Sequence, residues 1–536
     1  ILMAISLVAA ASAKLAHAST QFTVNSTGDT GDADTTDNVC DSDAGTSGDQ
    51  CTLKAAIQQA NFTTGADTID FNVSGPGCVD GVCTISPSGL PIITDQVIIN
   101  GYTQGDGTPG DTSDDATANT LAVGDDADLK IKLDGAEAGN GLKIEANNCT
   151  VKGLIISDWD NGIFLGENAT GNTVRGNFIG TDASGANLSN NIGVALTNAL
   201  QNTIGGTSAA ARNIISNNGA GISISGGKEN MIQGNYVGTN AAGDARLGNT
   251  QGMVLSNTQN NTIGGTTAAE RNIISGNGTW GVLISEAESE GNMVRGNYIG
   301  TDVTGKVTDP DGNPNNGIEL GNGLNGVVIR TGAHDNIIGG TTVGAGNIIS
   351  GNGYNGTDIN NTKSGVEVQF AITDPNKATG NRILSNSIYD NFKLGIDLYH
   401  TNNDPGVTDN DYAPPPDSDT GPNNLQNFPE ITSARSTIRL IGGHRRRVTV
   451  VRGTLRSEAF EHYNIQFFSS LTADPSGHGE GKRFLGGEIV KTNGSGDASF
   501  TFITRTRVPR GQVVTSTATN RSTGDTSEFS LAKTVS

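Results

Sequence analysis

Acidic residues in unique positions, and an aromatic residue between two of them, are the groups of this sequence that could do chemistry. Hydrolysis of a glycosidic bond needs two carboxylates facing one bond, and a lyase needs a base together with neutralisation of a uronate. Asp158-Trp159-Asp160 could stack a sugar ring on Trp159 and bond its hydroxyls through the flanking carboxylates. Four more charged groups follow near the end of the repeats: Asp374, Asp390, Lys393 and Asp397. Nothing in the sequence places these groups in one cleft, so we predict Asp158, Trp159 and Asp160 as ligand-binding residues and predict no catalytic residue.

Other charged residues recur at fixed spacing and are interpreted differently. A catalytic group has to be unique, whereas a group repeated about every 60 residues serves the repeating structure. Two such sets change character in their middle copy: Asp182, Asn240 and Asp302, and Arg175, Gln233 and Arg295. We therefore assign both sets to the scaffold.

Calcium is the one cofactor that the sequence suggests. Asp417, Asp419 and Asn423 place oxygen ligands at alternating positions around a glycine, as in the first half of a calcium loop. The distal glutamate of a complete EF-hand is absent, so a solvated turn is the alternative.

Among the five cysteines, Cys40 and Cys51 form one close pair and Cys78 and Cys83 another. In an exported chain these suggest two disulfides, although four cysteines allow three connectivities.

The elements that must position these residues are repeats of 58 to 62 residues between Asn172 and Ile299. One phrase appears three times with conservative changes, first as Asn-Thr-Val-Arg-Gly-Asn-Phe-Ile-Gly-Thr. A second phrase, Asn-Thr-Ile-Gly-Gly-Thr, is repeated between these copies. Each half-repeat holds three short apolar bursts bounded by Gly and Asn, which predicts three strands and three corners. Stacked units of this kind make a right-handed parallel β-helix. Asn side chains at fixed offsets are expected to form hydrogen-bonded ladders between coils.

Composition and charge set further limits. The formal charge is −22, which disfavours a nucleic-acid partner, yet residues 431–536 carry +7 and the rest therefore −29. Residues 1–18 resemble a secretory signal peptide, and no other segment is long and apolar enough to span a bilayer.

We predict a cap region over 19–65 with a helix after Thr52, and a β-helix over 66–398. A Pro/Asp-rich linker over 399–430 and an Ig-like β-sandwich over 431–536 follow, so the chain is all-β apart from the capping helix.

The two ends of the chain resemble a known family. Phe22-Thr-Val-Asn-Ser-Thr and Cys51-Thr-Leu-Lys-Ala-Ala-Ile-Gln-Gln-Ala-Asn61 are similar to the N-terminal region of the CSLREA-domain proteins, although Lys54 and Ala55 depart from the usual Arg and Glu. The tail is similar through Phe467-Phe-Ser-Ser470 and Thr526-Ser-Glu-Phe-Ser530. The resemblance implies an exported bacterial protein with right-handed β-helix repeats, and it implies no particular chemistry.

These observations favour an exported, non-catalytic β-solenoid that is secreted or held at the bacterial cell surface. We expect surface display or adhesion, with glycans or host and cell-surface components as partners. A polysaccharide lyase or glycoside hydrolase of the pectate-lyase-like β-helix type is the alternative. Two insertions, over residues 103–128 and 305–316, are expected to project from the solenoid, and such loops usually carry binding sites.

Overall fold

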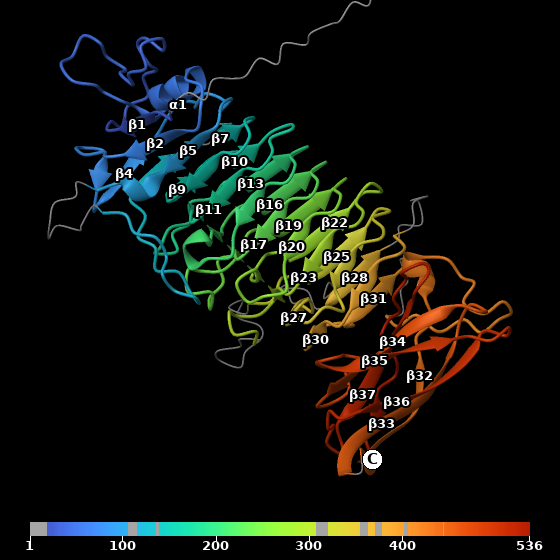
Figure 1. The fold of residues 1–536 in the computed structure, drawn as a ribbon. Helices are drawn as coiled ribbons and strands as arrows, with labels where there is room; N and C mark the ends of the chain where they lie inside the picture. The colour runs from blue at the N-terminus through green and yellow to red at the C-terminus, as the bar shows by residue number, and fades with distance from the viewer. Residues whose placement is uncertain are drawn as a thin grey trace, which may run out of the picture.

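The computed structural model describes residues 19–105, 115–135, 139–306, 320–353, 363–369, 378–400, 406–442 and 444–536. They form a long stack of parallel coils followed by a smaller two-sheet module at the C-terminus (Figure 1). Residues 1–18, where a signal peptide is predicted, lie outside the described residues. Parts of both predicted insertions, 106–114 and 307–319, do so as well. No helix within the described ranges is long and apolar enough to cross a membrane.

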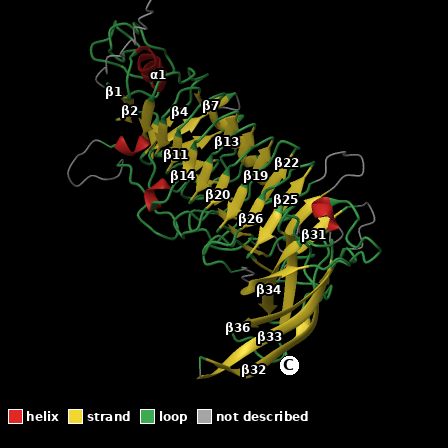
Figure 2. Cartoon of the chain, turned by 45° about the vertical axis from the view of Figure 1, so that its right-hand side comes forward, coloured by secondary structure: helices red, strands yellow, loops and turns green. Residues whose placement is uncertain are grey.

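Three sheets make up the walls of the solenoid, and the chain visits them in turn. Sheet I has eleven strands: β1 (Gln21–Val24), β2 (Asp67–Phe71), β5 (Val97–Asn100), β8 (Thr150–Lys152), β11 (Thr173–Arg175), β14 (Thr203–Gly205), β17 (Met231–Gln233), β20 (Thr262–Gly264), β23 (Met293–Arg295), β26 (Ile337–Gly339) and β29 (Arg382–Leu384). Sheet II also has eleven: β3 (Cys78–Val79), β4 (Val82–Ile85), β6 (Ile131–Asp134), β9 (Leu154–Ser157), β12 (Phe178–Ile179), β15 (Ile214–Ile215), β18 (Tyr236–Val237), β21 (Ile273–Ile274), β24 (Tyr298–Ile299), β27 (Ile348–Ser350) and β30 (Ser387–Tyr389). Sheet III has nine: β7 (Asn140–Ile144), β10 (Asn161–Leu165), β13 (Ile192–Thr197), β16 (Ala220–Ser225), β19 (Gln251–Ser256), β22 (Val282–Ser285), β25 (Val327–Arg330), β28 (Val366–Gln369) and β31 (Ile396–Tyr399). The predicted parallel β-helix is confirmed, and Figure 2 shows its strands stacked along one axis.

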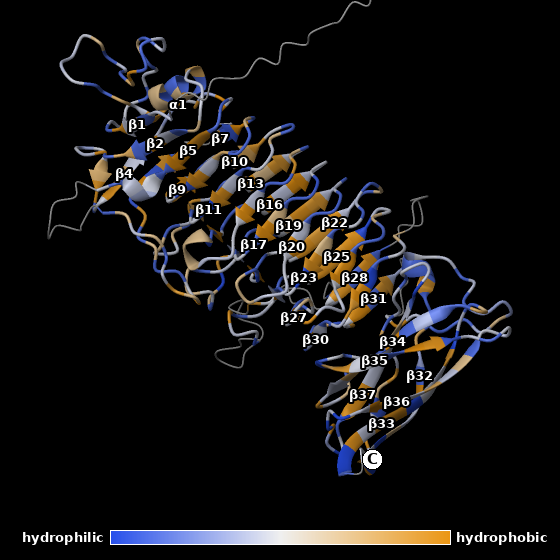
Figure 3. Cartoon of the chain, in the orientation of Figure 1, coloured by the Kyte–Doolittle hydropathy of each residue, from blue (hydrophilic) through white to orange (hydrophobic). Residues whose placement is uncertain are grey.

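The core is a set of apolar columns that run along this axis. Equivalent residues of successive coils pair in register, so that Val174 lies opposite Ile204 and Ile204 opposite Ile232. All three side chains are fully buried. The apolar strands are visible as the orange arrows of the solenoid in Figure 3. Because each strand contributes only one or two inward residues, the short bursts seen in the sequence are sufficient to fill the interior.

Buried asparagines join the coils at the corners and form three ladders, as predicted. In each ladder the Nδ2 of one Asn donates to the Oδ1 of its neighbour, for example from Asn230 to Asn261 at 2.9 Å. The same Nδ2 also donates to a backbone carbonyl, so the buried amide is satisfied. The first ladder contains Asn172, Asn202, Asn230, Asn261, Asn292, Asn336 and Asn381. The second contains Asn177, Asn213, Asn235, Asn272, Asn297, Asn347 and Asn386, and the third Asn190, Asn218, Asn249, Asn277, Asn322, Asn352 and Asn391.

A helix covers the N-terminal end of the solenoid. Helix α1 (Leu53–Phe62) packs against β1 and β2, and its Thr52 N-cap accepts a hydrogen bond from the Ala55 N–H at 3.0 Å. Leu53 and Ile57 are buried in the same core as the coils, as expected for a lid on an open apolar end. The first strand of sheet I, β1, lies within the predicted cap region and pairs in parallel with β2.

The structure joins Cys40 to Cys51 and Cys78 to Cys83 as disulfides. The second pair connects β3 to β4, which is the antiparallel turn at the start of sheet II. Cys149 is a buried free thiol, and its N–H donates to Asn172 Oδ1 at 2.8 Å, at the start of the first ladder.

The C-terminal module consists of two antiparallel sheets around a separate core. One sheet contains β32 (Glu430–Ile441), β33 (His444–Arg456) and β36 (Asp497–Thr504). The other contains β34 (His462–Ser470), β35 (Arg483–Lys491), β37 (Val513–Asn520) and β38 (Lys533–Thr534). A stacked pair of rings, Phe467 and Phe502, lies between the sheets with centroids 4.3 Å apart. The predicted alternating strands therefore form a sandwich.

Candidate functional site at the junction of the solenoid and the C-terminal module

The C-terminal module sits directly on the last coil of the solenoid. The N–H of Gly380 donates to Asp525 at 2.6 Å, and the N–H of Ile383 donates to Thr526 Oγ1 at 3.0 Å. Ile388 and Gly481 exchange two backbone hydrogen bonds of 3.1 and 2.9 Å. The open polar edge of the final strands is therefore covered, as a parallel solenoid requires at its end.

Two of the three asparagine ladders end on residues from outside the coils. In the first ladder, Asn423 of the 3-10 turn η4 (Pro422–Leu425) accepts the backbone N–H of Asn381 at 3.0 Å. In the third, Glu480 Oε1 accepts both the backbone N–H and the Nδ2 of Asn391, at 3.2 and 2.9 Å. The linker and the module thus supply the last acceptors for the solenoid.

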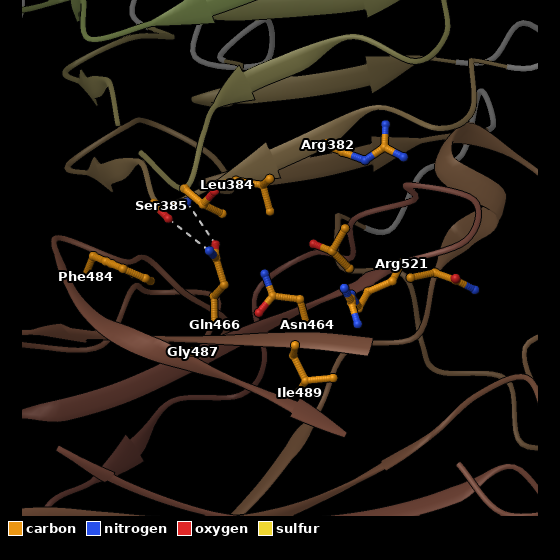
Figure 4. A pocket seen from close by; sticks show the side chains of 12 residues that line it. Arg382, Leu384, Ser385, Asn464, Gln466, Phe484, Gly487, Ile489 and Arg521 are labelled. Atoms are coloured by element: carbon orange, nitrogen blue, oxygen red, sulfur yellow. Dashed lines mark hydrogen bonds between the residues drawn. The ribbon is translucent and has the colours of Figure 1, made fainter. Parts of the chain in front are cut away.

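A pocket of about 490 Å³ opens between the module and sheet I (Figure 4). Its solenoid side is formed by Arg382 and Ser385 at β29, and its module side by residues of β34, β35 and β37. Gln466 fixes the two sides together, because its Oε1 accepts the Ser385 N–H at 2.8 Å while its Nε2 donates to Ser385 Oγ at 2.9 Å. Gln466 is buried, so this contact holds the shape of the pocket.

Two arginines line the pocket, one from each side of the junction (Figure 4). The Arg382 guanidinium lies over Gly524, where a Cβ atom would be only 2.7 Å from its Cζ. Arg521 directly follows β37, and its backbone N–H donates to the His462 carbonyl at 2.9 Å. Within the described ranges neither guanidinium forms a hydrogen bond or an ion pair. Two unpaired guanidinium groups beside one cavity are suited to an anion such as a carboxylate.

The rest of the lining combines amide and apolar groups. The Asn464 side chain has no hydrogen-bond partner in the part of the chain that is described, so it is free to bond a hydroxyl. Phe484 is 39% exposed and Ile489 56% exposed, which leaves apolar surface beside the polar groups. Hydroxyl-bonding amides, apolar patches and a charged pair are together the groups that a carbohydrate ring with an acidic substituent requires.

A second junction pocket, also about 490 Å³, contains the acidic groups of this region. Glu480 lies there with Asp390 and Asp474. Burial raises the pKa of Glu480 to about 8, and the nearby carboxylates of Asp474 and Asp390 add to the rise against the hydrogen bonds from Asn391. Lys482 lies 3.7 Å from Asp390. Glu480 therefore carries a proton at neutral pH, but its bonds to Asn391 give it a structural role in the ladder.

The structure separates the predicted site residues from both pockets. Trp159 is only 2% exposed, and its ring packs where a Cβ atom on Gly135 would lie. An indole this deeply buried exposes little surface on which a sugar ring could stack. Asp158, Trp159 and Asp160 together line a smaller pocket of about 260 Å³, and Asp160 accepts a hydrogen bond from Asn191 at 2.8 Å.

Of the three predicted calcium ligands, Asp417 and Asn423 bond to separate groups. Burial raises the pKa of Asp417, and the carboxylate of Asp419 lies close enough to Asp417 to help raise it. Asp417 is buried, and its oxygens accept hydrogen bonds from Gln426, Ser457 and the Asn427 N–H. Asn423 instead bonds to Asn381 and to the Thr526 carbonyl as part of the ladder. Within the described ranges no three His, Cys, Asp or Glu side chains are grouped as metal ligands would be.

Within the described residues, no two carboxylates lie close together beside the repeated set Arg175, Gln233 and Arg295. Arg175 pairs with Lys152 across neighbouring coils, whereas Gln233 and Arg295 pair with glycines. The carboxylates beside this face are Asp70, close to Lys152, and Glu270, close to Arg295. Asp70 lies in β2 and Glu270 in the turn after β20, and these two strands are six steps apart in sheet I, which corresponds to roughly 29 Å at about 4.8 Å per strand. Glycosidase pairs need separations below about 10 Å, so the described residues of this face do not form one.

Charged residues near the last coils are also dispersed. Asp397 is buried and accepts a hydrogen bond from Ser364 at 2.8 Å, while Lys393 is exposed. Asp374 lies outside the described residues.

The described part of the first insertion does not project from the solenoid. Arg212 donates hydrogen bonds to three of its carbonyls, including that of Ala122 at 3.0 Å, and these bonds hold the segment against sheet II.

No family model matches the chain, and no curated protein matches it. Among solved structures, the Dettilon tailspike protein (gp208) aligns over 86% of this chain and 91% of its own, with 13% identity and a TM-score of 0.36. The resemblance to CSLREA-domain proteins therefore stays a prediction.

Proposed function

We propose that this chain is an exported, non-catalytic β-solenoid that binds glycans at the junction pocket and serves in surface display or adhesion. The observation that carries the proposal is the pair of unpaired guanidinium groups, Arg382 and Arg521, that face one pocket together with a free amide and exposed apolar side chains. The resemblance of both chain ends to an exported family supports a place outside the cell. Host or cell-surface glycans are the expected partners.

The chemistry of the pocket specifies an acidic sugar. Each guanidinium can present a planar pair of N–H donors to a carboxylate, and the adjacent Asn464 can bond a neighbouring hydroxyl. Hydrogen bonds to charged groups contribute about 1.5–3 kcal/mol each, so either arginine should change affinity roughly 10- to 100-fold. Neutral glycans lacking the carboxylate should bind correspondingly more weakly.

Binding to a glycan array, followed by calorimetry on the best oligosaccharide, tests the proposal. We expect uronate- or sialate-bearing glycans to bind, and the Arg382→Gln/Arg521→Gln double variant to lose at least tenfold in affinity. The Arg452→Gln/Arg510→Gln variant is the matched control, because both arginines are exposed on the same module outside the pocket. Equal loss in both variants, or a preference for neutral glycans, would exclude the junction pocket as the site.

The alternative, a polysaccharide hydrolase or lyase, rests on the second junction pocket. Glu480 has the raised pKa that a general acid needs, and Asp390 and Asp474 lie nearby. Reducing-end and unsaturated-product assays on polyuronates decide between the two functions. Product formation that is lost in the Glu480→Gln variant would establish the enzyme, and we expect no product.

A further inference from the structure

A two-stranded arm extends from the end of the C-terminal module that is farthest from the solenoid (Figures 1 and 2). Strands β32 and β33 pair as far as Ile441 and His444, whereas the third strand, β36, pairs with β33 only from Thr449 onward. Residues 436–441 and 444–448 therefore form a ribbon without a third strand on that side. An isolated two-stranded ribbon is marginally stable, so its persistence needs a reason.

The ribbon is strongly basic and its charge is not compensated. Arg439, Arg445, Arg446 and Arg447 are all exposed, and the described part of the chain offers none of them an ion pair or a side-chain hydrogen bond. Arg439 and Arg446 lie directly opposite each other in the ladder. Like charges in directly opposed positions destabilise a β-ribbon, so this pairing is unfavourable unless an anion lies between or across the two side chains.

Both faces of the ribbon carry arginine. Directly paired residues share a face, which places Arg439 and Arg446 on one face and Arg445 and Arg447 on the other. The exposed apolar residues Ile438 and Leu440 lie opposite Arg447 and Arg445, so they alternate with charges. A ribbon that entered a lipid bilayer would need one continuous apolar face, and this one has none. A flexible polyanion, in contrast, can contact both faces.

The charge of the whole molecule restricts how such a polymer can approach. Residues 431–536 carry +7, whereas the remainder of the chain carries −29. A polyanion is therefore repelled by the solenoid and attracted to the module, and most strongly to its far end, which is blue at the tip of β33 in Figure 3. Contact at this end leaves the solenoid pointing away from the polymer.

We propose that the β32–β33 ribbon is a docking arm for an anionic polysaccharide, with Arg439, Arg445, Arg446 and Arg447 binding its carboxylate or other acidic groups. The arm holds the rod end-on to an anionic polymer layer. It is a site separate from the junction pocket and does not depend on the function proposed for that pocket.

Binding to immobilised polygalacturonate at several salt concentrations tests this proposal, with neutral dextran as the reference polymer. We expect the Arg445→Gln/Arg446→Gln/Arg447→Gln variant to bind at least tenfold more weakly and with a shallower salt dependence. The matched control, Arg452→Gln/Arg483→Gln/Arg510→Gln, removes the same charge from exposed positions outside the ribbon and should retain most of the binding. The Arg382→Gln/Arg521→Gln variant should lose affinity for short acidic oligosaccharides but retain most of its binding to the polymer, because the polymer contacts several arginines of the ribbon at once; this difference separates the ribbon from the junction pocket.

A stability measurement keeps the test independent of folding defects. Because Arg446→Thr removes the opposed charge, we expect it to raise the melting temperature in the absence of polymer and to weaken polymer binding. Equal loss in the ribbon and control variants, or failure of the wild-type protein to bind, would overturn the proposal. It would also be overturned if the ribbon instead bound phosphatidylglycerol vesicles in preference to polygalacturonate, or mediated salt-sensitive self-association in sedimentation velocity.

Discussion

Replacing Glu480 by glutamine should make the junction insensitive to pH between about 5 and 8. Glu480 is buried where the third asparagine ladder ends, and Oε1 accepts two hydrogen bonds from Asn391. A glutamine oxygen can accept the same two bonds without a charge. The substitution therefore preserves the contact and removes only the ionisation.

The direction of the pH effect follows from the raised pKa. Burial is the largest cause of the rise from 4.5 to about 8. Between these values the folded protein holds a proton that the unfolded chain has released, so the stability of the folded state falls as pH rises through this window. One pKa unit corresponds to about 1.4 kcal/mol, which sets an upper limit of about 5 kcal/mol for the loss by pH 9.

Urea unfolding of the full chain at pH 5, 7 and 9, followed by circular dichroism, measures the effect. We expect wild-type stability to fall by several kcal/mol across this range and the Glu480→Gln variant to fall much less, with the two converging near pH 5. Glu488→Gln, a more accessible glutamate of the same module, should follow the wild type. Parallel curves for wild type and Glu480→Gln would refute the reasoning, because they would show that Glu480 is ionised at no cost in the folded state.

Three further predictions concern the scaffold. Asn261→Ala leaves the backbone N–H of Asn230 without an acceptor and leaves the Asn230 Nδ2 with the Ala199 carbonyl alone, so it should destabilise the solenoid by about 2–4 kcal/mol in urea unfolding; a change below about 0.5 kcal/mol would contradict a structural ladder. Gly281→Ala would place a Cβ atom 2.6 Å from the Gly326 carbonyl oxygen, so we expect a loss of about 1–3 kcal/mol and a lower melting temperature; an unchanged one would contradict this packing. Replacing Cys40 and Cys51 by serine removes a cross-link between residues 11 positions apart and should cost about 3 kcal/mol, measured against the oxidised wild type; a serine variant as stable as the oxidised wild type would contradict the estimate.

Repetition in the sequence was sufficient to predict the solenoid, because each repeat adds the same local pattern of strand and corner. The asparagine ladders followed from fixed offsets such as Asn172, Asn202 and Asn230, since an inward amide can be satisfied by the same amide in the next coil. The capping helix was predicted from Thr52 and the apolar face after it. These features depend on residues close in sequence or on a regular period.

The candidate site could not be predicted in the same way, because it joins segments that are about 80 to 140 residues apart. Arg382 belongs to the last coils and Arg521 to the end of the chain, and only the docking of the module brings them to one pocket. The burial of Trp159 could not be predicted either, because it depends on Gly135 and Gly141, which make room for the ring and precede it in the sequence by 24 and 18 residues. Asn423 likewise resembled a metal ligand until the ladder accounted for its oxygen.

The way the ladders are closed has a consequence for the evolution of length. Every internal amide meets an identical amide above and below. The first amide of each ladder accepts a backbone N–H of the preceding coil, and two of the ladders end on Asn423 and Glu480. Duplication or deletion of a two-coil segment therefore leaves both closures chemically unchanged. Recombination between near-identical repeats can therefore change the length of the solenoid without any change to the residues that cover its two ends.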